Sequence, residues 1–236
     1  MQWPICSHYL EHAHPFQTSR TTLTIPFNLP LSSQGGPTNL ITFDIHALSE
    51  RFFFGDAVVP CLETAIPLLK ERLKRLPAGE RDIVIAYPDE GARKRFYKLF
   101  RGYPEIICTK VREGDNRIVR IKEGEEFIYQ GGGEPRVHVV IVDDLVQSGR
   151  TLIECQRVIS SRGSVQVSAF VTHGVFPGRS WMKFCNEEEF KYFWITDSCP
   201  QTVRQVAGVR PFEILSLAVP TSRVLSEIGC LEDKYE

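Results

Sequence analysis

The chain lacks an excess of charge of either sign. Its 236 residues carry 28 Lys and Arg against 29 Asp and Glu, a formal net charge of −1. Such a balance predicts no broad positive field for a nucleic acid, so any anion must be bound by local basic clusters. With 42% hydrophobic and 24% charged residues, the composition predicts a globular protein with a sizeable core, in one large or two small domains.

The sequence also lacks a long apolar run. No stretch approaches the ~20 residues of a membrane-spanning helix, and the N-terminus does not show the charged-then-apolar order of a secretory signal. The seven cysteines are odd in number and none stands in a C-x-x-C pair. This favours reduced core thiols in an intracellular protein. We therefore expect a cytoplasmic protein with no membrane and no nucleic-acid partner.

One stretch, residues 137–151, combines a strand pattern with functional side chains. Its near-continuous apolar run predicts a strand buried on both faces of a parallel sheet, and the run ends in Asp143 and Asp144. A small-residue loop follows, and Thr151 starts a helix. Backbone N–H groups at such a helix start can bind a monophosphate, while the two acids can reach ribose hydroxyls or hydrated Mg²⁺. The alternative is that the acids only form a turn or cap the helix.

Strands and helices alternate through most of the chain. Strands are expected at 39–43, 83–87, 106–111, 137–142, 165–171, 192–196 and 212–217. Helices are expected over 62–76, from a turn at 88–95 to about residue 100, from 151 onward, near 180–189 and over 222–228. Acids, His, Ser and Thr recur at the strand ends. We therefore expect an open parallel α/β sheet with a ligand crevice outside its carboxyl edge.

Two strand ends carry further candidate side chains. His46 follows the first strand and is suited to a metal or a nucleotide phosphate, or else to a half-buried hydrogen-bonding role. Asp89 follows the second strand, and a basic cluster at 93–95 lies in the next helical turn. Cations there oppose the helix dipole unless an anion is near, although a solvated basic face is the alternative.

Residues 110–135 are too polar and glycine-rich for a buried element. We expect a flap, with a β-hairpin as one form, which can close over a phosphate site and exclude water. The alternative is an ordinary exposed hairpin. In the segment 1–38, the three histidines His8, His12 and His14 have no acidic or cysteine partner at a useful spacing, so a surface segment is favoured over a metal cluster. The aromatic run 52–54 is expected at a subunit or domain interface.

Taken together, these motifs resemble a known family. The loop 143–151 is similar to the phosphoribosyl-diphosphate loop of type I phosphoribosyltransferases and of ribose-phosphate diphosphokinases, the phosphoribosylpyrophosphate synthetases. The further motifs D-I-H, P-D-E-G, K-V-R, T-H-G and T-D-S-C-P-Q occur in the synthetase order. The phrases F-D-I-H-A-L, K-V-R-E-G-D and D-D-L-V-Q-S-G look closest to the plant-type, class II enzymes. The resemblance runs from about Gly36 to the last helix.

The resemblance implies a phosphoribosyltransferase-type (type I) open parallel sheet flanked by helices, with a remnant of a second, similar domain. Residues 1–77 would be the remnant of the N-terminal synthetase domain and 78–236 the phosphoribosyltransferase-like C-terminal domain. The implied reaction moves the diphosphoryl group of ATP to ribose 5-phosphate, giving phosphoribosyl diphosphate for nucleotide biosynthesis, with Mg²⁺. Implied assemblies are a homo-oligomer or a hetero-oligomer with full-length paralogues. Alternatives are a non-catalytic synthetase-associated subunit and a salvage phosphoribosyltransferase.

The same resemblance assigns roles to individual residues. The catalytic pair would be Lys110 and Arg112, and the Mg²⁺ ligands His46 and Asp89. Nucleotide phosphates would meet Arg93 and Arg95. Ribose 5-phosphate would be held by Asp143, Asp144, Gln147, Ser148, Gly149, Arg150 and Thr151. One position departs from the family pattern: Arg150 stands where the family has Gly. A Cβ there would cost ~1 kcal/mol or more if the backbone is left-handed, or else Arg150 swings outward or adds a phosphate contact.

Overall fold

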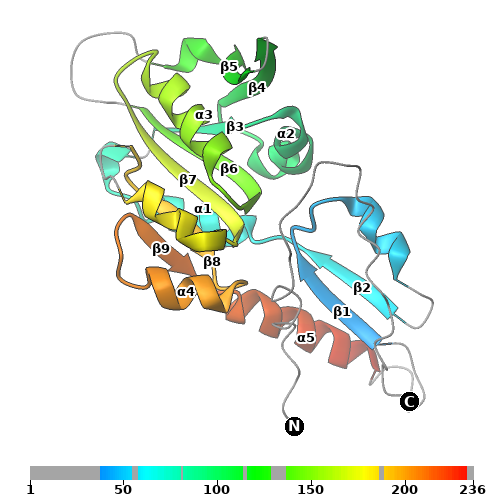
Figure 1. Cartoon of the computed structure of the whole chain (residues 1–236). Helices are drawn as coiled ribbons and strands as arrows, with labels where there is room; N and C mark the ends of the chain where they lie inside the picture. The colour runs from blue at the N-terminus through cyan, green and yellow to red at the C-terminus, as the bar shows by residue number, and fades with distance from the viewer. Residues whose placement is uncertain are drawn as a thin grey trace.

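The computed structural model describes residues 38–54, 58–80, 82–113, 116–128, 137–185 and 189–232, and a seven-stranded sheet forms its centre (Figure 1). The strands lie in the order β5-β4-β3-β6-β7-β8-β9, and only the β4–β5 pair is antiparallel. Their bounds are β3 (Ile83–Tyr87), β4 (Glu105–Glu113), β5 (Asn116–Glu123), β6 (Val137–Val146), β7 (Val165–Gly174), β8 (Phe193–Thr196) and β9 (Phe212–Leu215). The expected open, mostly parallel sheet is confirmed.

Helices cover both faces of this sheet. The α-helices are α1 (Ile66–Lys74), α2 (Glu90–Phe96), α3 (Arg150–Ser160), α4 (Pro200–Val206) and α5 (Ala218–Glu232). The 3-10 helices are η1 (Leu48–Phe53), η2 (Ala78–Glu80), η3 (Tyr97–Phe100), η4 (Glu125–Phe127) and η5 (Pro177–Phe184). Helices α1 and α2 pack on one face, whereas α3, α4 and η5 pack on the other.

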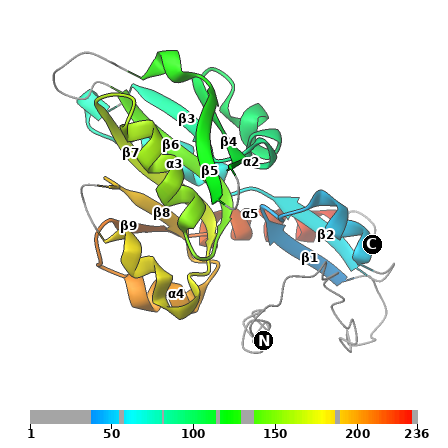
Figure 2. The same ribbon diagram turned by 45° about the horizontal axis from the view of Figure 1, so that its top comes forward.

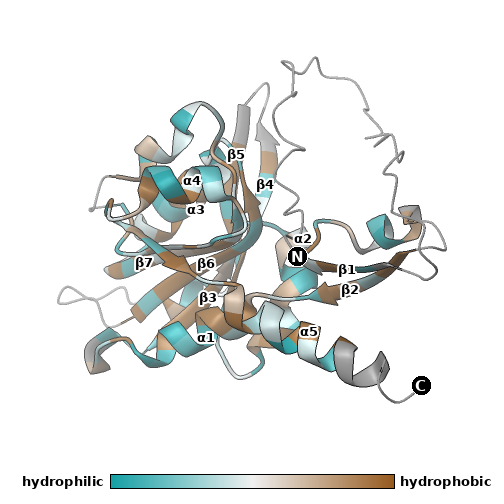
Figure 3. Cartoon of the chain, turned by 90° about the horizontal axis from the view of Figure 1, so that it is seen from below, coloured by the Kyte–Doolittle hydropathy of each residue, from teal (hydrophilic) through white to brown (hydrophobic). Residues whose placement is uncertain are grey.

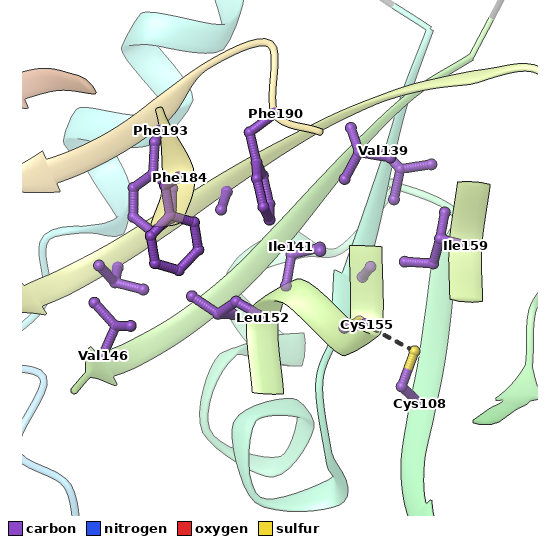
Figure 4. Close-up of a cluster of buried hydrophobic side chains, with 14 of the residues drawn as sticks. Cys108, Val139, Ile141, Val146, Leu152, Cys155, Ile159, Phe184, Phe190 and Phe193 are labelled. Carbon is purple, nitrogen blue, oxygen red and sulfur yellow. Dashed lines mark hydrogen bonds between the residues drawn. The ribbon is translucent and has the colours of Figure 1, made fainter. Parts of the chain in front are cut away.

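The apolar run of β6 explains why both faces are covered. Val139 and Ile141 point into the core beneath α3, and Val140 and Val142 point into the core beneath α1, because successive strand residues face opposite sides. Figure 4 shows the first of these cores, where Leu152 of α3 lies among the side chains of β6 and of the aromatic cluster. Figure 3 shows brown, apolar strands between helices that carry teal, hydrophilic residues.

A second, two-stranded parallel sheet pairs β1 (Thr38–Phe43) with β2 (Val58–Glu63). It lies beside the large sheet in Figures 1 and 2, and α5 runs from the large sheet toward it. The predicted domain boundary at residue 77 stays a prediction. Helix α1 precedes that boundary, yet Ile66, Leu69 and Leu73 are buried in the core of the large sheet.

Three expectations about elements were wrong in detail. The helix expected over 62–76 is the end of β2 followed by α1, the helix expected near 180–189 is the 3-10 segment η5, and α4 was not expected. The helical spacing of apolar residues had extended into an apolar strand. Pro67 and Pro200 stand in the first turns of α1 and α4, a position that proline favours, so each marked a helix start.

Other expectations are confirmed or lie beyond the described part of the chain. The hairpin expected after residue 110 is β4–β5, with Lys110 opposite Val119, but β5 is an edge strand of the large sheet and Val119 is buried in its core, so the expectation that this segment holds no buried element was wrong. In the ranges that the structure describes, no helix is long and apolar enough to cross a membrane. Cys108 and Cys155 are buried free thiols, as expected for core cysteines, whereas Cys61 and Cys199 are half-buried and Cys185 is exposed. The histidines of the first 38 residues and the glycines at 131–133 lie outside the described residues.

Candidate active site

A cleft of about 470 Å³ opens at the carboxyl ends of β3 and β6. These strands are neighbours, but the chain continues from β3 to β4 on one side and from β6 to β7 on the other. The two loops therefore diverge, which makes this the switch point where open α/β sheets bind ligands. The cleft brings together most of the predicted site residues: His46, Asp89, Arg95, Lys110, Asp143, Asp144, Gln147, Ser148, Gly149, Arg150 and Thr151.

The phosphate-type loop turns at Gly149, which is the N-cap of α3 with φ +75°. A Cβ at this position would lie 2.3 Å and 2.4 Å from ring carbons of Phe184, so glycine is required both by conformation and by space. No side chain caps α3, which leaves the first N–H groups of the helix available to an anion. Asp143 and Asp144 lie within β6 and do not cap this helix. The alternative that the two acids only form a turn or cap the helix is therefore wrong.

Arg150 does not strain the loop. It is the first residue of α3 and is absent from the residues with positive φ, so the concern about a Cβ here was wrong. Its side chain is 84% exposed and lies 3.6 Å from Glu154 one turn along. The left-handed position of the loop belongs to Gly149, one residue earlier.

The pKa values of the two adjacent acids at the end of β6 are shifted in opposite directions. Burial, together with the hydrogen bond and charge of Asp144, raises the pKa of Asp143 to about 8. Burial also opposes ionisation of Asp144, but hydrogen bonds from Asp143 and His46 and the charge of Arg95 hold its pKa below the usual value. Asp144 is therefore the ionised member of the pair.

Asp144 anchors two of the predicted residues. His46 Nδ1 donates to Asp144 Oδ2 at 2.7 Å, and Arg95 Nη1 lies 2.5 Å from the same oxygen. Arg95 also donates to the carbonyl oxygen of His46. Because Arg95 comes from α2 and His46 follows β1, this contact joins three separate segments in one wall of the cleft.

Asp89 and Lys110 form a second ion pair in the cleft. Asp89 is the N-cap of α2, where Oδ1 accepts the Ala92 N–H at 3.0 Å, and Lys110 Nζ donates to Oδ2 at 2.9 Å. Burial opposes ionisation of Asp89, but these two hydrogen bonds hold its pKa below the usual value. Lys110 extends from β4, so the hairpin is tied to the loop after β3.

Two predicted residues stand apart from this set. Arg93 points to β4, where its guanidinium lies 2.6 Å from Glu105, and it is not among the residues that line the cleft. The side chain of Arg112 lies outside the part of the chain that the structure describes.

A set of hydrogen bonds around Asp44, which the sequence did not predict, fixes the backbone just before His46; we call this set the joint. Asp44 is buried with φ +45°, and its Oδ2 accepts the Ala65 N–H at 2.9 Å and the Thr172 hydroxyl at 2.6 Å. His173 Nε2 donates to the carbonyl oxygen of Phe43 at 2.8 Å. These bonds attach the small sheet to β7. The available signal was the first residue of D-I-H, Asp44, together with the T-H-G motif.

In the described ranges, no group of three or more His, Cys, Asp or Glu is arranged to hold a metal ion. The donors nevertheless suit a hard cation, since carboxylates of Asp89, Asp143 and Asp144 line one cleft with His46. Asp143 also stays largely protonated near neutral pH, because its surroundings do not compensate a second negative charge.

A doubly wound sheet with an acid pair and an anion loop at its switch point defines a phosphoribosyltransferase-type α/β protein. The crystal structure of phosphoribosylpyrophosphate synthetase from Mycobacterium smegmatis shares this fold, with a TM-score of 0.62 at 20% identity over 80% of this chain and 58% of that one. The chain matches no protein-family model.

Sequence comparison finds more similar proteins than the structural comparison does. The chain is 55% identical over 214 residues to ribose-phosphate pyrophosphokinase 4 of Arabidopsis thaliana, covering 89% of this chain and 60% of that protein. It is 53% identical over 218 residues to the mitochondrial ribose-phosphate pyrophosphokinase 3 of Spinacia oleracea, covering 90% of this chain and 51% of that protein. Over about nine tenths of its length the chain is therefore similar to plant ribose-phosphate pyrophosphokinases. It spans about half to three fifths of the length of these relatives.

Proposed function

We propose that the chain is a ribose-phosphate diphosphokinase that transfers the diphosphoryl group of ATP to the C1 hydroxyl of ribose 5-phosphate. The observation that carries this proposal is the cleft itself. It gathers cations, acids and an anion loop from four segments that are far apart in the sequence, near residues 46, 89–95, 110 and 143–152. Diphosphoryl transfer needs this kind of charge neutralisation and positioning more than it needs a covalent nucleophile.

The acceptor sugar fits the β6–α3 side of the cleft. Its 5-phosphate would lie on the N–H groups of the loop 147–151 and the start of α3, which no side chain caps. The ribose hydroxyls would reach Asp143 and Asp144, one directly and one through a bound cation. The acids at 143–144 and the loop at 147–151 would thus recognise the two ends of one sugar phosphate.

Mg²⁺ would be held by His46 and Asp89, with Asp143 and Asp144 nearby. Mg²⁺ keeps several waters and uses few protein ligands, which agrees with an open set of oxygens rather than a closed cage. When bound, it would neutralise charge on the triphosphate. His46 would offer Nε2 to the cation while Nδ1 keeps its hydrogen bond to Asp144, and Asp89 would exchange Lys110 for the cation.

The nucleotide phosphates would meet the cations that line the cleft near Asp89 and Asp144. Lys110, released from Asp89, would reach the transferring group from the hairpin, with Arg112 two residues further on the same strand. Arg95 already lies in the cleft. Arg93 would have to leave Glu105 to join them, so we assign it the weaker role of the two arginines of α2.

The assay is formation of AMP by the purified chain from Mg·ATP and ribose 5-phosphate, paired with calorimetric titration of each substrate alone. We expect AMP to form and both substrates to bind. No AMP at saturating substrates would refute the enzymatic proposal. Binding of the sugar phosphate alone would then indicate a non-catalytic, synthetase-associated subunit, and base-dependent release of pyrophosphate from phosphoribosyl diphosphate would indicate a salvage transferase.

Assembly and location belong to the same proposal. Phe52 is 74% exposed beside the small sheet, which suits the expected homo-oligomer or hetero-oligomer with full-length paralogues. Light scattering of the purified chain, alone and mixed with a paralogue, tests this. The cytoplasmic location stays a prediction, since one relative is named mitochondrial and another chloroplastic; imaging of a fluorescent fusion would decide it.

A further inference from the structure

Side chains of η5, a segment more than thirty residues further along the chain, donate hydrogen bonds to the backbone of the anion loop 147–149. Ser180 Oγ donates a hydrogen bond to the carbonyl oxygen of Gln147 at 2.8 Å, and Lys183 Nζ donates to the carbonyl oxygen of Ser148 at 3.3 Å. Two consecutive peptide carbonyls of the loop are therefore fixed by side chains of one segment. Neither donor lines the cleft.

These contacts determine which way the loop N–H groups point. The C=O and N–H of one planar trans peptide point in opposite directions. Because the Gln147 and Ser148 carbonyls point to η5, the N–H groups of Ser148 and Gly149 point away from it. Both of these residues line the cleft. The contacts thus aim two donors at the place where an anion would lie.

The third contact closes the end of the loop. Phe184, the last residue of η5, is fully buried and occupies the space where a Cβ of Gly149 would be. Its ring packs edge-on against Phe193 with centroids 4.7 Å apart, and Phe190 lies at 5.4 Å (Figure 4). The segment that holds the loop is therefore itself fixed to the aromatic core.

We propose that Ser180 and Lys183 are positioning residues that preset the loop 147–149 for the phosphate of its ligand. This inference rests on the proposed function for the identity of that ligand, ribose 5-phosphate. Without the two donors, either carbonyl can turn toward the cleft and repel the anion, and binding must then order the loop at an entropic cost. A preset loop avoids both.

Variants of the two donors distinguish an effect of loop orientation from an effect of positive charge on phosphate affinity. Ser180→Ala removes a neutral hydroxyl, so a loss of affinity in that variant cannot come from lost electrostatic attraction. Lys183→Met keeps the aliphatic stem but removes both the hydrogen bond and a positive charge near the anion. Only the charge part of the Lys183 effect should shrink as salt is raised.

The test is calorimetric titration of the full chain with ribose 5-phosphate, together with KM values for both substrates. We expect Ser180→Ala to raise the Kd for ribose 5-phosphate about fivefold, the effect of one neutral hydrogen bond. Ser180→Thr keeps the hydroxyl and should retain wild-type affinity. KM for Mg·ATP should not change, because its proposed phosphate contacts, Lys110 and Arg95, have neither Ser180 nor Lys183 as a partner. The matched control is Met182→Ala in the same segment, where the side chain is 61% exposed.

The outcomes distinguish this inference from the proposed function. The inference is overturned if the Kd for ribose 5-phosphate of both Ser180→Ala and Lys183→Met is within twofold of the wild-type value. If Ser180→Ala does not fold, the exposed Lys183→Met variant decides. If the wild-type chain does not bind ribose 5-phosphate, the proposed function fails, and inorganic phosphate becomes the probe of the loop. Tighter phosphate binding by wild type than by the variants supports the inference; equal binding, or none, refutes it.

Discussion

Gly149→Ala is the substitution that tests the geometry of the anion loop most directly. An alanine at φ +75° costs about 1 kcal/mol relative to glycine. The new Cβ would also meet the Phe184 ring at 2.3 Å, and overpacking of this kind costs roughly 1–3 kcal/mol. We therefore expect a loss of about 2–4 kcal/mol in the free energy of unfolding. In a chain of this size that corresponds to a fall of roughly 4–16 °C in Tm.

Arg150→Gly at the next position is the matched control. Arg150 is helical, so glycine there relieves no strain and weakens the first turn of α3 by about 0.5–1 kcal/mol. The expected affinity for ribose 5-phosphate is unchanged or lower. A higher affinity in Arg150→Gly would show that the family's glycine is needed at this position after all.

The assay is thermal and denaturant unfolding of the single variants and of the double variant Gly149→Ala/Phe184→Leu. If the cost comes from the ring, the smaller leucine makes room and the double variant loses less than the sum of the two single losses. Strict additivity would refute the steric argument and leave only the backbone term. A Gly149→Ala variant as stable as wild type would refute both.

Three further predictions follow from the site. Lys110→Met should lower kcat about 10²-fold with little change in the Kd for ribose 5-phosphate, whereas Lys122→Met on the same hairpin should not change kcat. Asp143 has a folded pKa raised to about 8, so its contribution to stability is full below the unfolded value of about 4 and is lost as pH rises to 8; Asp143→Asn should remove that loss, measured by urea unfolding at pH 5 and pH 8. Asp44→Asn should destabilise the chain by about 1–3 kcal/mol and lower kcat more than it raises KM for ribose 5-phosphate, since the bond from Thr172 helps to hold the D-I-H loop.

Each of these has a contradicting result. Equal kcat losses in Lys110→Met and Lys122→Met would point to general charge loss on the hairpin rather than to a specific contact. A wild-type pH profile in Asp143→Asn would place the titrating group elsewhere. Loss of stability in Asp44→Asn with unchanged kcat would make the joint structural only. Thr172→Val, which removes the hydroxyl that Asp44 accepts, should reproduce the Asp44 result.

Local sequence was enough for the strands that frame the cleft. The apolar run before Asp143 predicted β6 because a strand buried on both faces favours apolar residues at successive positions. The functional residues were visible because they stand at the ends of such strands. The loop and the helix start after β6 were predicted from the small residues at 148–149 and the apolar spacing that follows Thr151. Errors arose where two patterns overlap: the helical spacing of α1 continued into β2, and only Pro67 marked the boundary.

Tertiary structure decided the pairing of the side chains and the strain in the loop. The resemblance to a family placed the demand for glycine at Arg150, but the fold places it at Gly149, because the turn is completed there and Phe184 fills the space beside it. Likewise, no local pattern shows that Ser180 supports Gln147, or that Asp44 accepts from Thr172. These contacts join residues 33 and 128 positions apart, and only the folded chain brings such residues together. The sequence by itself therefore determined which residues are available for phosphate and ribose chemistry, and the tertiary structure determined how they are aimed.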